Sequence, residues 1–286
     1  MNKMGRARQD ASMGRALAGL LSYAVMGLFA LMTVYPILWL LINSVKDKTE
    51  YLTNKLGLPA KFTFFNFVQA WTLGDFDRLI VNSFLYTFGA TFATVFLSFL
   101  AGFALAKIPS RATPAVYNGF LIGILLTLQS IMIPLFVLMS NLGLYDTHLG
   151  VLIPYVGIGL PMGVYIGTEY IRSVPDALIE SARIDGAPYF RVFRSIVFPM
   201  AVPAATTLSI MNVASTWNEF MLINVLASRT EVKSLPLGIF RFSGPRSSDY
   251  GTQFAALAIG MLPMLLFYLA FQRRIAEGVA AGAVKG

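Results

Sequence analysis

Apolar residues form six long stretches along the chain, each longer than the usual core helix of a soluble domain. The stretches fall at about residues 17–42, 82–106, 116–140, 149–168, 199–223 and 252–271. A helix needs about 20 apolar residues to cross the roughly 30 Å hydrocarbon layer of a bilayer. The pattern therefore predicts an all-α integral membrane protein with six transmembrane helices.

The same pattern predicts how the chain is organised. We expect an N-terminus, a first span with a long external loop, a membrane core that contains one long polar loop at 169–198, and a C-terminus; these segments are 1–16, 17–81, 82–272 and 273–286. The first apolar run is too long for a signal peptide, and no small-residue cleavage site follows it, so we expect it to remain as a span.

Composition and charge support a membrane protein. Hydrophobic residues make up 56% of the 286 positions and charged residues 13%, and the mean hydropathy is +0.67. The net charge of +8 comes from basic residues that flank the apolar stretches, with no basic stripe interleaved with aromatics, so we expect no nucleic-acid partner. The positive-inside rule places both termini in the cytoplasm, by 13 basic residues to 9.

The loop at 169–198 carries most of the local structure that the sequence predicts outside the spans. Ser173 and Asp176 have the spacing of a capping box, and Gly186 is placed to end the helix in a left-handed conformation. Pro188 suits the first turn of a second helix, whose broad apolar face is expected at the membrane interface. The loop is thus predicted to be a helix-turn-helix on the cytoplasmic side, with an ordinary amphipathic connector as the alternative.

The second half of this loop has a recognisable sequence. Glu180-Ser181-Ala182-Arg183-Ile184-Asp185-Gly186, nine residues and Ile196-Val197-Phe198-Pro199 follow each other in order. This stretch resembles the EAA loop of permease subunits of type I, binding-protein-dependent ABC importers, with Ser181 and Phe198 as departures from the family's alanine and leucine. The resemblance implies that the loop is a coupling helix that docks on an ABC ATPase. The ATPase-coupling residues would be Glu180, Ser181, Ala182, Arg183, Asp185, Gly186 and Ala187.

A second resemblance concerns the cargo. Asn212, Thr216 and Glu219 recur at helical spacing in the fifth span, and an ionisable residue within a span indicates function by default. Trp217-Asn218-Glu219-Phe220 resembles a stretch common in maltose-type carbohydrate permeases, so Asn212, Thr216, Trp217, Asn218 and Glu219 are candidates for the substrate path. The alternative for Glu219 is a solvated position near the external surface.

Two further faces consist of small residues, and each has two interpretations. Hydroxyl side chains follow one face of the second span, and glycines follow one face of the fourth; they are Ser83, Thr87, Thr91, Thr94 and Ser98, then Gly159, Gly163 and Gly167. Both patterns are typical of closely packed helices, and the hydroxyl face is also compatible with a wetted path.

Several chemistries lack the residues that they need. The chain has one histidine and no cysteine, so we expect no metal site, and it has no P-loop, so ATP and Mg²⁺ are expected only on the partner ATPase. The resemblance implies a subunit that forms half of the path for a carbohydrate, with a second homologous permease, an ABC ATPase dimer and an extracytoplasmic binding protein as partners. The alternatives are an importer permease for another solute, a stand-alone secondary transporter or channel, and a membrane enzyme, although no cluster of acid, base or metal ligands favours an enzyme.

Overall fold

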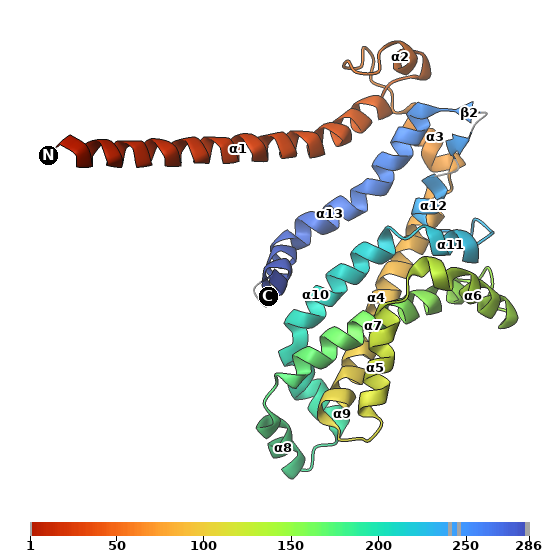
Figure 1. Ribbon diagram of the computed structural model, residues 1–286. Helices are drawn as coiled ribbons and strands as arrows, with labels where there is room; N and C mark the ends of the chain where they lie inside the picture. Colours follow the sequence, from red (N-terminus) through yellow and green to blue (C-terminus); the bar gives the residue numbers. More distant parts are fainter. Residues whose placement is uncertain (1, 240–241, 245–246, 284–286) are drawn as a thin grey trace. The chain divides into compact units, whose positions relative to one another are not determined.

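The computed structural model describes residues 2–239, 242–244 and 247–283, and these residues are almost entirely helical (Figure 1). The elements are α1 (Asn2–Ser44), α2 (Lys48–Thr53), α3 (Phe65–Leu73), α4 (Phe76–Lys107), α5 (Thr113–Ile124), α6 (Leu128–Asn141), α7 (His148–Arg172), α8 (Asp176–Ile184), α9 (Tyr189–Val192), the π-helical turn η1 (Phe193–Val197), α10 (Phe198–Trp217), α11 (Met221–Leu226), α12 (Leu235–Ile239) and α13 (Tyr250–Ala283). Two very short strands, β1 (Ser243–Gly244) and β2 (Ser247–Ser248), complete the described elements. The predicted all-α class is confirmed.

The chain divides into two compact units, which are described separately. The first comprises Met1–Ala70 and Pro245–Ile259, and the second comprises Trp71–Gly244 and Gly260–Gly286.

In the first unit, the end of α1 and the start of α13 meet through aromatic rings. Trp39 lies 5.1 Å from Phe254 between ring centroids, and Tyr51 of α2 lies 5.3 Å from the same ring. Because α1 ends where α13 begins, the two spans have one end on the same side of the membrane.

A buried lysine orders the chain that follows α1. The ammonium of Lys46 donates hydrogen bonds of 2.7 Å to the carbonyl oxygens of Asn54 and Gly57, and the residue is fully buried. Burial lowers the pKa of Lys46 below its ordinary value, against the opposing effect of the nearby Glu50 carboxylate. The amide of Asn66 donates to two backbone carbonyls of the same turn.

In the second unit, α4 and α7 are the central pair of helices. The hydroxyl residues that the sequence places on one face of α4 are all buried: Ser83, Thr87, Thr91, Thr94 and Ser98. A Cβ atom added to Gly102 of α4 would lie 2.8 Å from the backbone nitrogen of Thr168 in α7, so the two backbones are in near contact there. A Cβ at Gly163 would collide with the side chain of Ser98. These contacts confirm the close-packing interpretation of both faces.

The pair α4 and α7 also fixes how the chain crosses the membrane between them. Near the start of α4, the hydroxyl of Tyr86 lies 2.9 Å from Nδ1 of His148, the first residue of α7. At the other end, Nζ of Lys107 lies 3.4 Å from the carbonyl oxygen of Arg172, so the last residues of both helices also meet. Since α4 and α7 run in the same direction, the chain must return across the layer between them, and α5 with α6 makes that crossing.

The returning segment corrects the third predicted span. Within the residues that the structure describes, five helices are long and apolar enough to cross a membrane alone, and α5 with α6, bent by 108° between them, would be the sixth. The continuous helix predicted at 116–140 is therefore wrong in its middle. Thr127 takes an extended conformation there, so the helical path is interrupted before α6 begins at Leu128.

The fifth predicted span is also too long. We expected a helix over 199–223, but α10 ends at Trp217 and the short helix α11 follows at Met221. The side-chain amide of Asn218 donates a 2.8 Å hydrogen bond to the carbonyl oxygen of Ala214. It thereby occupies a carbonyl that a longer helix would have bonded to a backbone N–H.

Candidate functional site

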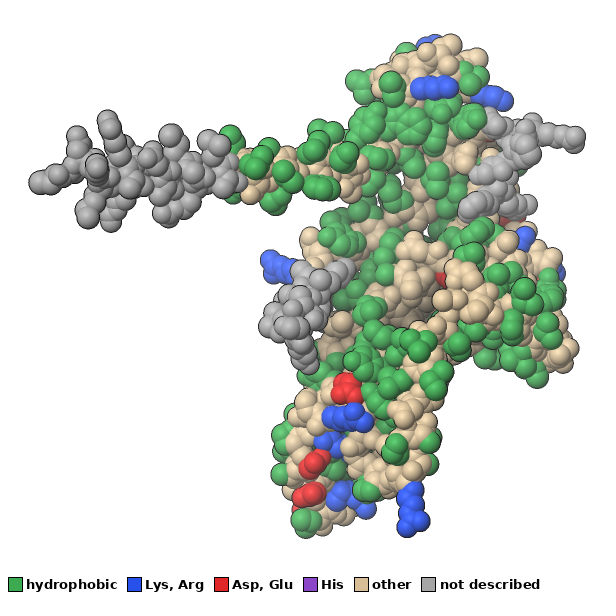
Figure 2. Space-filling view, in the orientation of Figure 1, with side chains coloured by type: hydrophobic (Ala, Val, Ile, Leu, Met, Phe, Trp, Pro, Cys, Tyr) green, Lys and Arg blue, Asp and Glu red, His purple; other side chains and the backbone are tan. Residues whose placement is uncertain are grey.

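Two places in the second unit bring together the residues that the sequence singles out. We name its two ends by their helices: the α8 end holds Lys107, Arg172 and α8, and the α11 end holds Tyr86, Asp146 and α11. Figure 2 shows charged side chains gathered over α8 and the adjoining loops, while apolar side chains are more frequent further up on the visible face.

At the α8 end, α8 ends in a Schellman motif. The backbone N–H of Ala187 donates to the carbonyl of Ala182, and that of Gly186 donates to the carbonyl of Arg183. Gly186 has φ of +77°, and a Cβ added there would meet nothing within 4 Å. The glycine is therefore required by backbone conformation and not by space, as the sequence predicts.

Arg183 stabilises this turn from its own side. Its guanidinium donates a 2.8 Å hydrogen bond to the carbonyl oxygen of Ala187 and lies 4.2 Å from the ring centroid of Tyr189. These contacts hold the Arg183 side chain against its own loop, and a contact of Arg183 with an ATPase stays a prediction. Glu180, Ser181, Asp185 and Gly186 remain exposed on the outer side of the loop, with Ala182 and Ala187 half-buried beneath them.

One local expectation about this loop is wrong. Ser173 makes no capping box with Asp176; its hydroxyl donates to the carbonyl oxygen of Tyr170 and so closes the end of α7 instead. The apolar face after Pro188 is divided: Val192 and Phe193 are buried, with the Phe193 ring 5.7 Å from that of Phe103 in α4, whereas Tyr189 and Phe190 are exposed. Its place at the membrane interface stays a prediction. The turn η1 then leads directly into α10.

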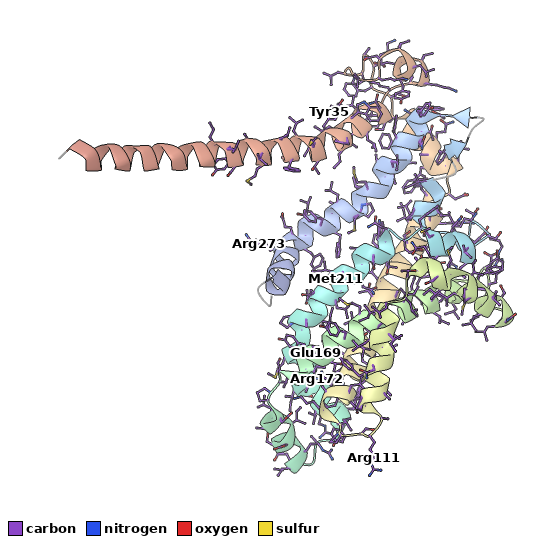
Figure 3. The ribbon with its side chains drawn as sticks, viewed as in Figure 1. Tyr35, Arg111, Glu169, Arg172, Met211 and Arg273 are labelled. Carbon is purple, nitrogen blue, oxygen red and sulfur yellow. The ribbon has the colours of Figure 1, made fainter. Side chains whose placement is uncertain are left out.

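Sequence reasoning missed two features of the α8 end. Ile184, the last residue of α8, is 86% exposed, so an apolar side chain stands at the tip of a polar helix. Glu169 binds both the hydroxyl of Tyr117 in α5 and the guanidinium of Arg172, each at 2.6 Å. Figure 3 labels Glu169 and Arg172 together on α7, and their contacts tie α5 to α7 near the α8 end.

The second place is a cavity of about 380 Å³ between α7 and α10. Its polar lining comes mainly from α10 and the residues after it, and Met211, labelled in Figure 3, belongs to its apolar wall. The lining residues are Leu128, Tyr155, Ile158, Gly159, Met162, Leu208, Met211, Asn212, Ser215, Thr216 and Glu219.

The cavity brings together three of the five predicted substrate-path residues. Asn212, Thr216 and Glu219 line it, whereas Trp217 and Asn218 do not. Trp217 is buried with its ring 5.2 Å from that of Phe84 in an edge-on contact, so it packs α10 against α4. The side chain of Asn218 is turned back to its own helix.

Glu219 also differs from its prediction, because it lies in the break between α10 and α11 and not within a span. Its carboxylate accepts hydrogen bonds from the backbone N–H groups of Leu222 and Ile223, at 2.7 and 3.2 Å. The hydroxyl of Tyr155 donates a third hydrogen bond, of 2.7 Å, to the same carboxylate. A carboxylate at the start of a helix is favourable for the helix dipole, so Glu219 starts α11 as well as lining the cavity.

Above the cavity, a charged contact closes the α11 end. The carboxylate of Asp146 accepts hydrogen bonds from the backbone N–H groups of Ser228 and Arg229 and from the Arg229 guanidinium, at 2.8 to 3.0 Å. Burial of Asp146 opposes its ionisation, but these hydrogen bonds and the Arg229 charge outweigh burial and hold the pKa of Asp146 below its ordinary value.

Membrane-crossing helices around a mainly apolar cavity with a few polar groups, and an exposed, firmly capped helix at one end, are typical of a subunit of a membrane transport system. The chain belongs to the family described as "Binding-protein-dependent transport system inner membrane component", which matches residues 98–280. The family resemblance inferred from the loop Glu180–Pro199 is thereby confirmed. The matched range includes α8 and both walls of the cavity.

Relatives and solved structures agree with this membership. The chain is 31% identical over 281 residues to a diacetylchitobiose uptake system permease protein of Streptomyces coelicolor, which covers 98% of this chain and 93% of the relative. It is 34% identical over 276 residues to a multiple sugar-binding transport system permease protein of Streptococcus mutans, covering 92% and 96%. A bacterial ABC transporter that imports the acidic polysaccharide alginate shares the fold, with a TM-score of 0.80 at 22% identity over 90% of this chain and 96% of that one.

Proposed function

We propose that this chain forms half of the translocation path of an ATP-driven importer, and that its cargo is a carbohydrate delivered by an extracytoplasmic binding protein. The observation that carries the proposal is the exposed helix α8, closed by the Gly186 cap and by the Arg183 hydrogen bond. A helix held so firmly on its inner side, with Glu180, Asp185 and Ile184 free on its outer side, suits docking to another subunit.

The proposed partners follow from this role. α8 would dock on an ABC ATPase dimer, which binds ATP and Mg²⁺, while a second homologous permease completes the path. We place α8 and both termini on the cytoplasmic side of a bacterial inner membrane. The meeting of the end of α1 with the start of α13 supports termini on one side, and the basic flanks indicate which side.

The cavity supports a carbohydrate as cargo. Sugars need hydrogen-bonding groups and an apolar or aromatic surface, and the cavity offers Asn212, Thr216 and Tyr155 beside methionine side chains. Among the described residues that line it, Glu219 is the only charged one, so an anionic sugar would meet repulsion there. We therefore propose a neutral carbohydrate, in keeping with the chitobiose and multiple-sugar relatives.

Reconstitution tests the proposal. The chain, co-expressed with its candidate permease and ATPase partners, is purified through a tag on this chain and placed in liposomes with the binding protein. We expect the ATPase to co-purify, and uptake of neutral oligosaccharides to require both ATP and the binding protein. Transport by the purified chain alone would support a secondary transporter instead, and ATP-driven uptake of non-sugar solutes only would remove the carbohydrate.

Glu219→Gln sharpens the cargo test, because glutamine keeps the shape of the side chain and removes its charge. If Glu219 disfavours anionic cargo, this variant should admit uronate-containing sugars that the native chain rejects. The matched control is Asn218→Ala, which changes the neighbouring side chain outside the cavity. Identical cargo profiles of the native chain and Glu219→Gln would show that Glu219 only starts α11.

A further inference from the structure

Lys107, the last residue of α4, is nearly buried and binds three oxygens. Its ammonium lies 2.7 Å from the carbonyl oxygen of Val174, 2.6 Å from the Asp176 carboxylate and 3.4 Å from the carbonyl oxygen of Arg172. The Lys107 side chain is 6% exposed, whereas that of Asp176 is 73% exposed. An ammonium has three N–H donors, so all of them are engaged here. This is more than the role of a basic flank at the end of a span, which is all that the sequence assigns to Lys107.

The three oxygens lie before, within and after the link between α7 and α8. α7 ends at Arg172, α8 begins at Asp176, and only Ser173, Val174 and Pro175 join them. A link of this length would let α8 swing relative to α7. Because one ammonium binds the last residue of α7, the middle of the link and the first residue of α8, it holds the angle between the two helices.

Lys107 also stands on a rigid base. Five residues earlier in α4, Gly102 is in near contact with the backbone of α7 at Gly167 and Thr168. Phe99 and Phe103 of α4 pack in the same buried cluster as Ile179 of α8. A displacement of α8 would therefore move α4 and α7 together, provided that the link between α7 and α8 does not bend.

We propose that Lys107 is a positioning residue that makes α8 move together with the α4–α7 pair, so that a push on α8 by the ATPase tilts the pair instead of bending the link. The inference rests on the proposed ATP-driven function. Arginine is a poor substitute, because its planar guanidinium presents donors in a fixed fork, whereas these three oxygens surround a single nitrogen.

The test compares Lys107→Met with Arg111→Met in the complete importer in liposomes. Both variants remove one positive charge from the same end of the unit, but Arg111 is exposed in the loop between α4 and α5 and points away from the fold (Figure 3). ATP hydrolysis and uptake are measured on the same vesicles. Loss of a merely structural contact would lower both activities together, so the informative quantity is the number of cargo molecules taken up per ATP hydrolysed.

We expect Lys107→Met to lower uptake per ATP about tenfold, the usual size of a coupling between two sites, while Arg111→Met leaves it unchanged. Lys107→Arg should recover only part of the loss. Native uptake per ATP in assembled Lys107→Met complexes would overturn the inference and leave the proposed function intact. Failure of the native chain to bind an ATPase or to depend on ATP would instead remove the proposed function itself.

If Lys107→Met does not assemble, a second pair of variants gives the answer. Asp176→Asn keeps an oxygen acceptor on an exposed side chain and removes its charge, so it should assemble and show a smaller loss of uptake per ATP. The chain has no cysteine, so Lys107→Cys with Asp176→Cys can be joined by a short thiol cross-linker. Recovery of uptake per ATP on cross-linking supports the inference; no recovery, together with a native ratio in Asp176→Asn, contradicts it.

Discussion

The two ends of the α4–α7 pair are each closed by one charged side chain, but the two fastenings are built differently. At the α8 end, the buried cation of Lys107 binds oxygens on both sides of a three-residue link. At the α11 end, the anion of Asp146 binds N–H groups of two consecutive residues and the guanidinium of Arg229, which is 64% exposed. The first fastening depends on a single nitrogen, whereas at the second the backbone of Asp146 makes further hydrogen bonds, to Leu226 and to the Arg229 guanidinium, that do not use the carboxylate.

This difference indicates what each end does. When a helix is held through one atom, loss of that atom uncouples the helix from its neighbours completely. This suits α8, the helix proposed to be moved by the ATPase. A distributed fastening survives the loss of any one partner, which suits an end that must stay closed. The five predictions that follow test this contrast, from the largest expected effect to the smallest.

The largest effect is expected from Gly163→Leu, in the middle of the pair on which both ends depend. Any side chain there collides with Ser98 of α4 and comes within 3.2 Å of Leu208 of α10. Overpacking of this kind costs about 3 kcal/mol, so little folded protein should be recovered by size-exclusion chromatography after extraction in detergent. Gly119→Leu, on an exposed face of α5 with nothing within 4 Å of its Cβ, is the control. Equal yields of the two variants would mean that α4 and α7 are not a rigid pair.

Gly186→Val should have the next largest effect, and only at the α8 end. A β-branched residue at φ of +77° costs about 1–2 kcal/mol or more, which favours loss of the helix cap. We expect normal membrane insertion but about tenfold lower ATP-driven uptake, the usual size of a coupling between two sites. Gly186→Asn is the matched control, because asparagine tolerates this conformation, and it should lose much less. Native uptake by Gly186→Val would show that the helix cap at Gly186 is not needed for coupling to the ATPase.

Asp146→Ala should weaken the α11 end without uncoupling transport. Removing the carboxylate takes away the hydrogen bonds of the Ser228 and Arg229 N–H groups, and because these residues are exposed, the loss is about 1 kcal/mol of the free energy of unfolding. A lower apparent melting temperature in detergent, with unchanged uptake per ATP, is the expected result. A loss of coupling with unchanged melting would reverse the roles that we assign to the two ends.

The same carboxylate gives a pH dependence. Because folding lowers the pKa of Asp146, its contribution to stability is present above the ordinary value of 3.8 and is lost as the pH falls through the lower pKa of the folded state. The native chain should therefore lose more stability than Asp146→Ala when the pH is lowered into that range.

Arg229→Met should have the smallest effect. The guanidinium is largely exposed, and exposed ion pairs contribute about 0–1 kcal/mol, while the backbone donors to Asp146 remain. We expect a melting temperature close to the native one in high salt. A loss as large as that of Asp146→Ala would mean that this end, too, depends on one partner.

Much of the fold follows from the sequence because bilayer thickness imposes long apolar helices. The pattern of glycine and hydroxyl residues also predicts how α4 and α7 meet, since only small residues permit such close backbones. Gly186 is predictable for a similar reason: a left-handed residue at the end of a helix calls for glycine.

The features that the sequence predicts wrongly, or does not reveal, depend on contacts that form only in the folded chain. The bend after Ile124 contains no proline or glycine at its centre, and Thr127 and Ser130 are too common in spans to mark a break. Glu219 starts α11 through hydrogen bonds that a helical pattern does not reveal. Lys107 resembles every other basic residue that flanks a span, because its partners lie more than 60 positions further along the chain. Such roles become visible only when the helices are assembled.

The bend in the α5–α6 crossing has a mechanical consequence of its own. Its first half is joined to α7 through Tyr117 and Glu169, and its second half packs beside α11 through residues such as Met132 and Leu135. A change in the distance between these two attachment points must be taken up by the three residues between the two helices, which would act as a hinge. A membrane segment with such a hinge can change the distance between its two ends without unwinding either helix.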